Sequence, residues 1–359
     1  MEFDFAEVLL QVMERNASDL HLTAGSPPMI RHHGQLHALD YPHLTPQLTR
    51  EVIYSILTND QRQRLETDWQ IDFAYSIPGK ARFRVNAYMQ RAALSAAFRL
   101  IPHDMPKLST LGLPPILEEF TKKPRGFVLV TGPTGSGKST TLAAMLDHIN
   151  DSRHEHILTI EDPIEFLHKH KKCIVNQREL GADAQSFGLG LKAALRQDPD
   201  VILVGEMRDL ETISTALTAA ETGHLVFATL HTQDTAQTVD RIVDVFPPAQ
   251  QQQVRVQLSV SLQGIVTQQL MPTADGKGRC VGVEVLVPTP AVRNLIREGK
   301  THQIYSTLQT GASHGMQTMD AALVELMRAG KISKELAESR SASPEELRRL
   351  MGGSSMRAA

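Results

Sequence analysis

The chain has few cysteines, few aromatic residues and no long apolar run. Its 359 residues include 2 cysteines and 1 tryptophan, and aromatic residues make up 5%. Cys173 and Cys280 are too far apart in sequence for a C-x-x-C zinc pair, and two cysteines are too few for a disulfide framework. No apolar run reaches the roughly 18 residues that span a bilayer. These absences favour a reduced, cytoplasmic protein without direct membrane insertion.

An excess of charge of one sign is also absent. Lysine and arginine total 37 and aspartate and glutamate total 40, which gives a net charge of −3. This balance does not favour nucleic acid or an anionic membrane as a partner, so no nucleic acid is expected. The residues at the start of the chain are acidic where a signal peptide would be basic. The length predicts two domains, each large enough for its own core.

The most informative segment is residues 132–139, Gly-Pro-Thr-Gly-Ser-Gly-Lys-Ser, which matches the phosphate-loop pattern G-x-x-x-x-G-K-[ST]. It follows an apolar, strand-like run at 127–131 and precedes a helix-like run at 140–146, the context that this loop requires. Glycines let backbone N–H groups face phosphate oxygens, Lys138 reaches the β- and γ-phosphates, and Ser139 holds Mg²⁺. The residues predicted to bind a nucleoside triphosphate are Gly132, Pro133, Thr134, Gly135, Ser136, Gly137, Lys138, Ser139 and Thr140.

The pattern of apolar residues divides the chain. Residues 1–100 predict a small α/β domain, with one helix over 45–65 and alternating strands later, and residues 101–122 predict a linker. From 123 to 350, short apolar strands alternate with helices, which is typical of a mainly parallel sheet covered on both faces. The strands expected there are 127–131, 157–160, 201–204, 225–229 and 283–287. Residues 351–359 predict a disordered tail.

Acidic residues follow two of these strands. Glu161 and Glu165 come after 157–160, and Glu206 comes after 201–204. The carboxyl ends of parallel strands form the ligand edge of such a sheet. A phosphate-loop enzyme needs a carboxylate near Mg²⁺ and a polar group that orients the attacking water. These three glutamates are candidates, although each could instead be a solvated loop carboxylate or a helix cap.

Two histidines bracket the strand expected at 225–229. His224 precedes it and His231 follows it, so they are not i, i+4 metal ligands on a helix. Thr229 and His231 fall at the carboxyl end, where a group that senses the γ-phosphate would lie. A single histidine in such a place is more often a structural hydrogen-bonding group.

Arginines are frequent in the first domain, at Arg82, Arg84, Arg91 and Arg99. They could form a solvated sheet face. Alternatively, an arginine from a neighbouring domain or subunit could neutralise transition-state charge on the γ-phosphate.

Taken together, these motifs resemble the PilT family of type IV pilus retraction ATPases, which belongs to the secretion-type ATPases. The resemblance covers nearly the whole chain. It rests on residues 18–21 and 81–86, the loop 132–139, the acidic box 160–166, the segment 204–209 and the histidine box 223–232.

The resemblance implies a PAS-like first domain, a RecA-like second domain and a homohexamer with ATP at its subunit junctions. It implies that Glu206 helps to hold Mg²⁺ and that Glu165, or as second choice Glu161, positions water. Arg82, Arg84 and Arg99 fall on the family's candidate arginine fingers, whereas Arg91 is one position early. His231 is placed with the catalytic residues, and His224 and Thr229 with those that bind nucleotide.

The segment 289–299 resembles the family motif A-I-R-N-L-I-R-E that is linked to retraction, with Val292 in place of isoleucine. Its pattern predicts a helix capped by Thr289 and ended by Gly299, with Arg293 more exposed. On pattern alone it could be an ordinary surface helix. The chain lacks the cysteine-rich zinc insert of assembly-type relatives. It also departs from the family at Gln197, where a glutamate is usual, and at the glycine-rich segment 188–190.

The expected function is therefore that of a hexameric ATPase that drives pilus retraction, with residues 101–122 as a hinge. The expected partners are other copies of the chain, an inner-membrane pilus platform protein and a second retraction ATPase. Alternatives are an accessory retraction ATPase or a type II secretion-type ATPase, a nucleotide-gated module without turnover, and a RecA-like nucleic-acid translocase. The net charge disfavours the translocase.

Overall fold

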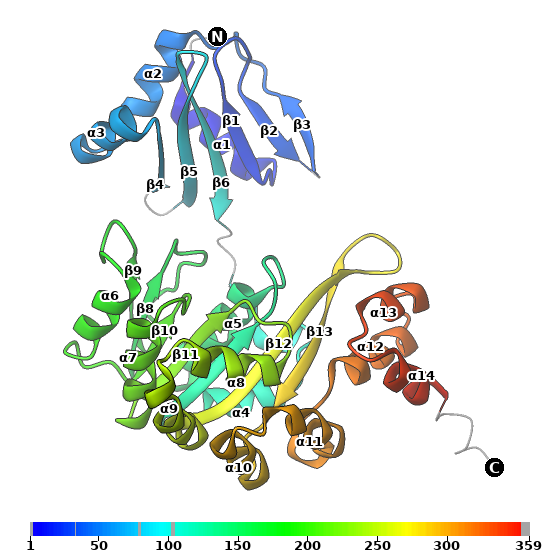
Figure 1. Ribbon diagram of the computed structural model, residues 1–359. Helices are drawn as coiled ribbons and strands as arrows, with labels where there is room; N and C mark the ends of the chain where they lie inside the picture. Colours follow the sequence, from blue (N-terminus) through cyan, green and yellow to red (C-terminus); the bar gives the residue numbers. More distant parts are fainter. Residues whose placement is uncertain (1–2, 33, 78–79, 102–104, 353–359) are drawn as a thin grey trace. The chain divides into compact units, whose positions relative to one another are not determined.

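The computed structural model describes residues 3–32, 34–77, 80–101 and 105–352 (Figure 1). The chain divides into two compact units, with the boundary between residues 104 and 105. Within the described residues, no helix is both long enough and apolar enough to cross a membrane.

The first unit is built on a six-stranded antiparallel sheet in the order β3-β2-β1-β6-β5-β4. One face is buried and the other carries polar residues, because side chains alternate along each strand: Phe83 and Val85 are fully buried, whereas Arg84 is exposed. The strands are β1 (Asp19–Leu22), β2 (Met29–His32), β3 (Gln35–Ala38), β4 (Gln70–Ile77), β5 (Ala81–Gln90) and β6 (Ala93–Ile101). The helices are α1 (Phe5–Glu14), α2 (Pro46–Ser55) and α3 (Asn59–Asp68).

The single helix expected over 45–65 is wrong, because two helices occupy this region. Thr58 begins the second: its hydroxyl accepts from the Gln61 N–H at 3.3 Å, and the Gln61 side chain accepts from the Thr58 N–H at 2.9 Å. This capping box satisfies N–H groups that a continuous helix would have bonded internally.

The second unit contains a seven-stranded sheet in the order β13-β12-β7-β11-β10-β8-β9. Every neighbouring pair is parallel except β12–β13. The strands are β7 (Gly126–Thr131), β8 (His156–Glu161), β9 (Ile174–Glu179), β10 (Val201–Val204), β11 (Leu225–Leu230), β12 (Leu262–Pro272) and β13 (Arg279–Leu286). A strand is present at each of the five expected places, but β9 and β12 were not expected. The predicted fold class, a small α/β domain followed by a domain with a mainly parallel sheet, is confirmed.

Helices cover both faces of this sheet. Phe127 and Leu129 of β7 pack in one apolar cluster, and Val128 and Val130 pack in another. The helices are α4 (Ile116–Thr121), α5 (Lys138–Ser152), α6 (Phe187–Ala194), α7 (Leu210–Glu221), α8 (Thr235–Asp244), α9 (Pro248–Ser261), α10 (Pro290–Glu298), α11 (Ile304–Thr310), α12 (Met319–Arg328), α13 (Lys334–Arg340) and α14 (Pro344–Gly352). Since consecutive residues of β7 face opposite sides, the strand is buried on both, as its continuous apolar run predicts.

The segment expected to be a linker, 101–122, is largely part of the second unit. Leu108, Leu117 and Phe120 are buried in one of its apolar clusters, and α4 lies within this range. Residues 102–104 lie outside the described residues. At the other end, α14 includes Met351 and Gly352, which the sequence had assigned to a disordered tail, and residues 353–359 of that tail also lie outside the described part.

Candidate nucleotide-binding site

The phosphate loop joins the carboxyl end of β7 to the first residue of α5, Lys138. Gly137 has φ 90° and Gly132 has φ 135°, both in the left-handed region that favours glycine. A Cβ at Gly132 would lie 2.4 Å from the backbone oxygen of Gln268, a residue of β12. The loop therefore leaves β7 in close contact with the neighbouring strand, which only glycine permits.

The loop has an exposed tip and a buried second half. Pro133, Thr134 and Gly135 are exposed, whereas Ser136 and Lys138 keep only 2% and 9% of their surface exposed. The Lys138 Nζ donates to the backbone oxygens of Gly132 at 2.8 Å and Pro133 at 3.0 Å.

Lys138 also lies in the electric field of two of the candidate glutamates. Burial lowers the pKa of Lys138, and the charges of Glu206 and Glu165 act in the opposite direction. The structure thus brings the loop lysine and these two carboxylates together, although they come from three separate segments of the chain.

Glu206 follows β10 and is the centre of a small polar cluster. Its Oε1 accepts from the Arg208 Nε at 2.5 Å and lies 3.1 Å from the His231 Nε2. Thr229 is not bonded to the carboxylate: its hydroxyl donates to the backbone oxygen of Gly205 at 2.5 Å and so fixes the turn that presents Glu206. His231 and Thr229 are therefore at the carboxyl edge of the sheet, as the sequence predicts.

Glu161 ends β8, the strand next to β10, and is half-buried. Its Oε1 accepts from the Thr159 hydroxyl at 2.6 Å and from the Gln177 Nε2 at 3.1 Å. Burial raises the pKa of Glu161 to about 7. These two hydrogen bonds, and one from the backbone of Glu165, lower the pKa but do not outweigh the effect of burial. Glu165 itself is exposed. The two glutamates of the acidic box therefore differ: one is held by neighbours and the other is open to solvent.

The residues present fit Mg²⁺ with ATP. Ser139, at the start of α5, supplies a hydroxyl, and Glu206 supplies a carboxylate, both hard oxygen ligands. Among the described residues, no group of three or more His, Cys, Asp or Glu side chains could hold a metal ion. A Mg²⁺ ion that takes one or two protein ligands, waters and phosphate oxygens needs no such group.

His224 lies at the opposite edge of the sheet. In the parallel pairing of β7 and β11, Leu225 is opposite Gly126 and Leu230 is opposite Thr131, so the loop and His224 are separated by the length of the strand. The His224 Nδ1 lies 3.0 Å from the Ala219 backbone oxygen, at the end of α7. Within this unit, His224 therefore does not reach the loop, and its contacts are those of a structural residue.

The three arginines expected to act on ATP lie on one face of the first unit's sheet. Arg84 of β5 is directly opposite Arg99 of β6, and both are exposed. The Arg99 Nε donates to the Asp19 Oδ1 at 2.9 Å, and Arg82 donates to the Ser76 hydroxyl at 3.4 Å. The structure groups these arginines, and it places them in a different unit from the loop.

The helix expected at 289–299 is present as α10, with Thr289 as its N-cap and Gly299, at φ 69°, as its C-cap. Arg293 differs from expectation, because it is half-buried. Its guanidinium donates to the backbone oxygens of Ser259 at 2.5 Å, Val260 at 2.9 Å and Leu262 at 2.9 Å. It thus satisfies carbonyls at the end of α9, which have no partner within their own helix.

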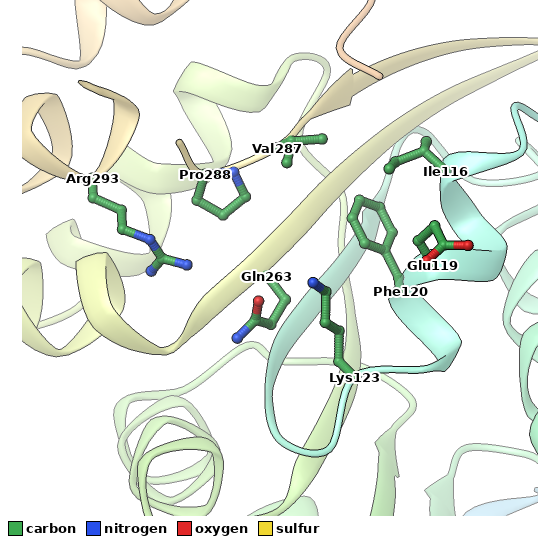
Figure 2. A pocket seen from close by; sticks show the side chains of 8 residues that line it. All are labelled: Ile116, Glu119, Phe120, Lys123, Gln263, Val287, Pro288 and Arg293. Atoms are coloured by element: carbon green, nitrogen blue, oxygen red, sulfur yellow. The ribbon is translucent and has the colours of Figure 1, made fainter. Parts of the chain in front are cut away.

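Arg293 also borders a small cavity of about 160 Å³ (Figure 2). Figure 2 shows Ile116 and Phe120 of α4 across the cavity from Arg293. The other lining residues are Glu119, Lys123, Gln263, Val287 and Pro288. Gln263 belongs to the first residues of β12, which pair with the start of β7, so the cavity and the phosphate loop lie at opposite edges of the sheet.

A phosphate loop on an inner strand of a mainly parallel sheet, with acidic residues at the ends of β8 and β10, defines a phosphate-loop nucleotide-binding domain. The chain belongs to the family described as type II/IV secretion system protein, which matches residues 2–350.

Individual relatives narrow this further. The chain is 52% identical to the type IV pilus retraction ATPase PilT of Pseudomonas aeruginosa, over 95% of this chain and 99% of that protein. It is 52% identical to the twitching motility protein of Neisseria gonorrhoeae, over 89% of this chain and 86% of that protein. A crystal structure of the pilus retraction motor PilT with bound ADP is 51% identical, with a TM-score of 0.91, and the match covers 97% of this chain and 100% of that one. Its close homologues are thus pilus retraction ATPases.

Several side chains of the site were not found from the sequence. Thr159 and Gln177 hold Glu161, Arg208 holds Glu206, and Gln268 contacts the loop. Thr159 carried a usable signal, because it lies two residues before Glu161 and therefore on the same strand face. Gln177 and Gln268 carried none, since both lie on strands that were not expected.

Proposed function

We propose that the chain hydrolyses ATP with Mg²⁺ and uses the energy to drive type IV pilus retraction. The observation that carries the proposal is the buried Lys138 at the start of α5, on which the charges of Glu206 and Glu165 act. It supplies positive charge for the β- and γ-phosphates next to carboxylates for the metal and the water. The identity to pilus retraction ATPases along nearly the whole chain supports the coupling to retraction.

Each group has a part in this proposal. Backbone N–H groups of the loop and Lys138 would bind the phosphates, and Ser139 and Glu206 would hold Mg²⁺, which would neutralise charge on the phosphate oxygens. Glu165, the exposed glutamate, orients the attacking water. Glu161 is the second choice, because its Oε1 is already occupied by Thr159 and Gln177. His231 orients Glu206, to which it is bonded.

The proposed working form is a homohexamer in the cytoplasm, bound to an inner-membrane pilus platform protein. Arg82, Arg84 and Arg99 would then act on ATP held by the second unit of the same or another copy. Two observations support this: the arginines share one face, and Arg84 and Arg99 are exposed. We place the PAS-like domain at about 1–104 and the RecA-like domain at 105–352, in agreement with the two compact units.

The test is ATP turnover by the wild-type chain, Lys138→Ala and Glu206→Ala, with Lys277→Ala as a control at an exposed lysine of the β12–β13 turn. Turnover should fall at least about a hundredfold in the first two variants, the scale of losing a charge that stabilises the transition state. Undiminished turnover in both would refute the site.

The direction of work needs a cellular test. Deletion of the gene should abolish twitching and leave cells with more pili, and Lys138→Ala should not restore twitching. Normal twitching after deletion would instead favour an accessory role. DNA-stimulated, salt-sensitive turnover would favour a nucleic-acid translocase.

A further inference from the structure

The strand β12 is the element of the second unit that lies against the phosphate loop. It pairs with β7 in parallel up to Thr267 opposite Thr131, the residue that immediately precedes the loop. The next residue, Gln268, is only 1% exposed. A Cβ on Gly132 would lie 2.4 Å from the backbone oxygen of Gln268 and 2.7 Å from the Ser136 Oγ. Gln268 and Ser136 therefore both lie against Gly132.

One buried polar side-chain atom of each of these two residues, Ser136 and Gln268, has no hydrogen-bond partner among the residues that the structure describes. They are the Ser136 Oγ and the Gln268 Oε1. A buried polar group without a partner destabilises a fold, so each such group needs an explanation. A hydroxyl both donates and accepts, and therefore it can pair with either end of the Gln268 amide.

The Gln268 side chain extends along the loop. Its Nε2 lies 3.8 Å from the position of a Cβ on Gly137, whereas its backbone oxygen is beside Gly132. Gln268 therefore lies against the loop at two places, with its backbone at the first glycine and its side-chain amide near the last. Gln269, the following residue, points to the other face of the strand and is half-buried.

The hydrogen bonds of Lys138 indicate when the pair would form. Its Nζ now binds the Gly132 and Pro133 backbone oxygens. An ammonium has three donors and two of them bind these carbonyls, so contact with both the β- and the γ-phosphate releases at least one carbonyl, and the loop can then readjust around Gly132. This is the residue at which Ser136 and Gln268 meet.

We propose that Gln268 is a positioning residue of the nucleotide site: its side-chain amide pairs with the Ser136 hydroxyl when the loop binds phosphate, and it thereby fixes the loop against β12. Gln268 need not touch the nucleotide. Its contribution is to lower the free energy of the phosphate-binding loop conformation, and affinity rises because the nucleotide binds that conformation. The inference rests on the proposed function, since it requires that the loop binds a nucleotide.

The test is a double-mutant cycle with Ser136→Ala, Gln268→Met and the two together, in the full-length chain. Methionine keeps the length of glutamine but removes the amide, and Gln269→Met is the matched control. ADP and ATP affinities are measured by equilibrium titration with a fluorescent analogue, and melting temperatures are measured without nucleotide. Each single variant should weaken binding about five- to tenfold, the scale of one hydrogen bond, and the double variant should be no weaker than either.

The melting temperature without nucleotide separates this role from a structural one. It should be unchanged or slightly higher in both single variants, because the two atoms have no partner there to lose and their burial without one costs stability. A lower melting temperature with unchanged affinity would overturn the proposal, and so would multiplicative losses in the double variant. If Gln268→Met does not fold, Ser136→Ala and Gln268→Asn provide the same cycle.

Lys138→Ala distinguishes failure of the proposed nucleotide site from failure of the positioning role of Gln268. If it binds nucleotide as the wild type does, the proposed site itself is wrong. If it loses binding while Ser136 and Gln268 act independently, only the positioning role of Gln268 is wrong.

Discussion

The parallel strands of the second unit's sheet begin at one edge, the amino edge, and end at the other, the carboxyl edge. Polar side chains at these two edges differ in how fully their hydrogen-bonding groups are used. At the amino edge, the Arg293 guanidinium binds three backbone carbonyls, and the His224 backbone and ring bind neighbouring backbone groups. At the carboxyl edge, Lys138 uses two of its three donors on carbonyls of its own loop, Glu165 is exposed, and Ser136 has no partner within the described chain. A polar residue whose hydrogen-bonding capacity is fully used stabilises the fold, whereas one with capacity to spare can bind a ligand.

A single strand connects the two edges. β12 begins beside Gly126 and Arg293 and passes Gly132 at Gln268. Gly126 packs against β12 at the amino edge and Gly132 packs against it at the carboxyl edge. The same glycine-to-alanine substitution can therefore be made at both edges.

The largest difference is expected between Gly132→Ala and Gly126→Ala. Both glycines have positive φ, 135° and 121°, and a Cβ would lie 2.4 Å from the Gln268 backbone oxygen or 2.7 Å from the Ser261 backbone oxygen. Each substitution should lower the free energy of unfolding by about 1–3 kcal/mol. Only Gly132→Ala should also abolish nucleotide binding, because it displaces the loop.

This prediction is checked by urea denaturation and nucleotide titration of both variants. Equal losses of affinity would show that the two edges are not functionally distinct.

A smaller effect is expected from Arg293→Ala. It leaves carbonyls at the end of α9 without a donor, so the free energy of unfolding should fall by about 1–3 kcal/mol. ADP affinity should be unchanged, because Arg293 is at the amino edge. Arg297→Ala, on the exposed side of α10, is the control and should change stability by less than about 0.5 kcal/mol. A selective loss of ADP affinity in Arg293→Ala would contradict this assignment.

The smallest effect concerns pH. The pKa of Glu161 in the folded chain, about 7, is above its ordinary value of 4.5, so between these values the folded state binds the proton more tightly than the unfolded state. The stability contributed by the protonated group is present at low pH and is lost as pH rises through 7. At pH 8 the melting temperature of Glu161→Gln should therefore be about 2–4 °C above that of the wild type, which corresponds to about 1 kcal/mol in the free energy of unfolding. Near pH 4.5 the two melting temperatures should be equal. The check compares the melting temperatures of Glu161→Gln and of the wild type at pH 4.5 and pH 8.

The sequence predicted the phosphate loop, its flanking elements and five strands of the second sheet, because each carries a strong local pattern. It did not predict β12, since glutamines interrupt its apolar run and α9 continues into it without a turn. Gln268 was missed for this reason. His224 was grouped with the site because it belongs to the histidine box, 223–232, on which the family resemblance rests. A residue before a parallel strand and one after it lie at opposite ends of that strand. Leu117 and Phe120, three residues apart, already indicated a packed helix in the expected linker.

The arginine face of the first unit has a consequence for its response to salt. Arg84 and Arg99 are directly opposite each other, and Asp19 pairs with Arg99. Like charges in this arrangement repel, and the distance beyond which dissolved ions screen exposed charges falls from about 10 Å at 0.1 M salt to about 3 Å at 1 M. Added salt should therefore weaken the repulsion between the two arginines. It should weaken the attraction between Arg99 and Asp19 much less, because Asp19 is buried. Raising the ionic strength thus reduces the repulsion between Arg84 and Arg99, as an anion bound between them would.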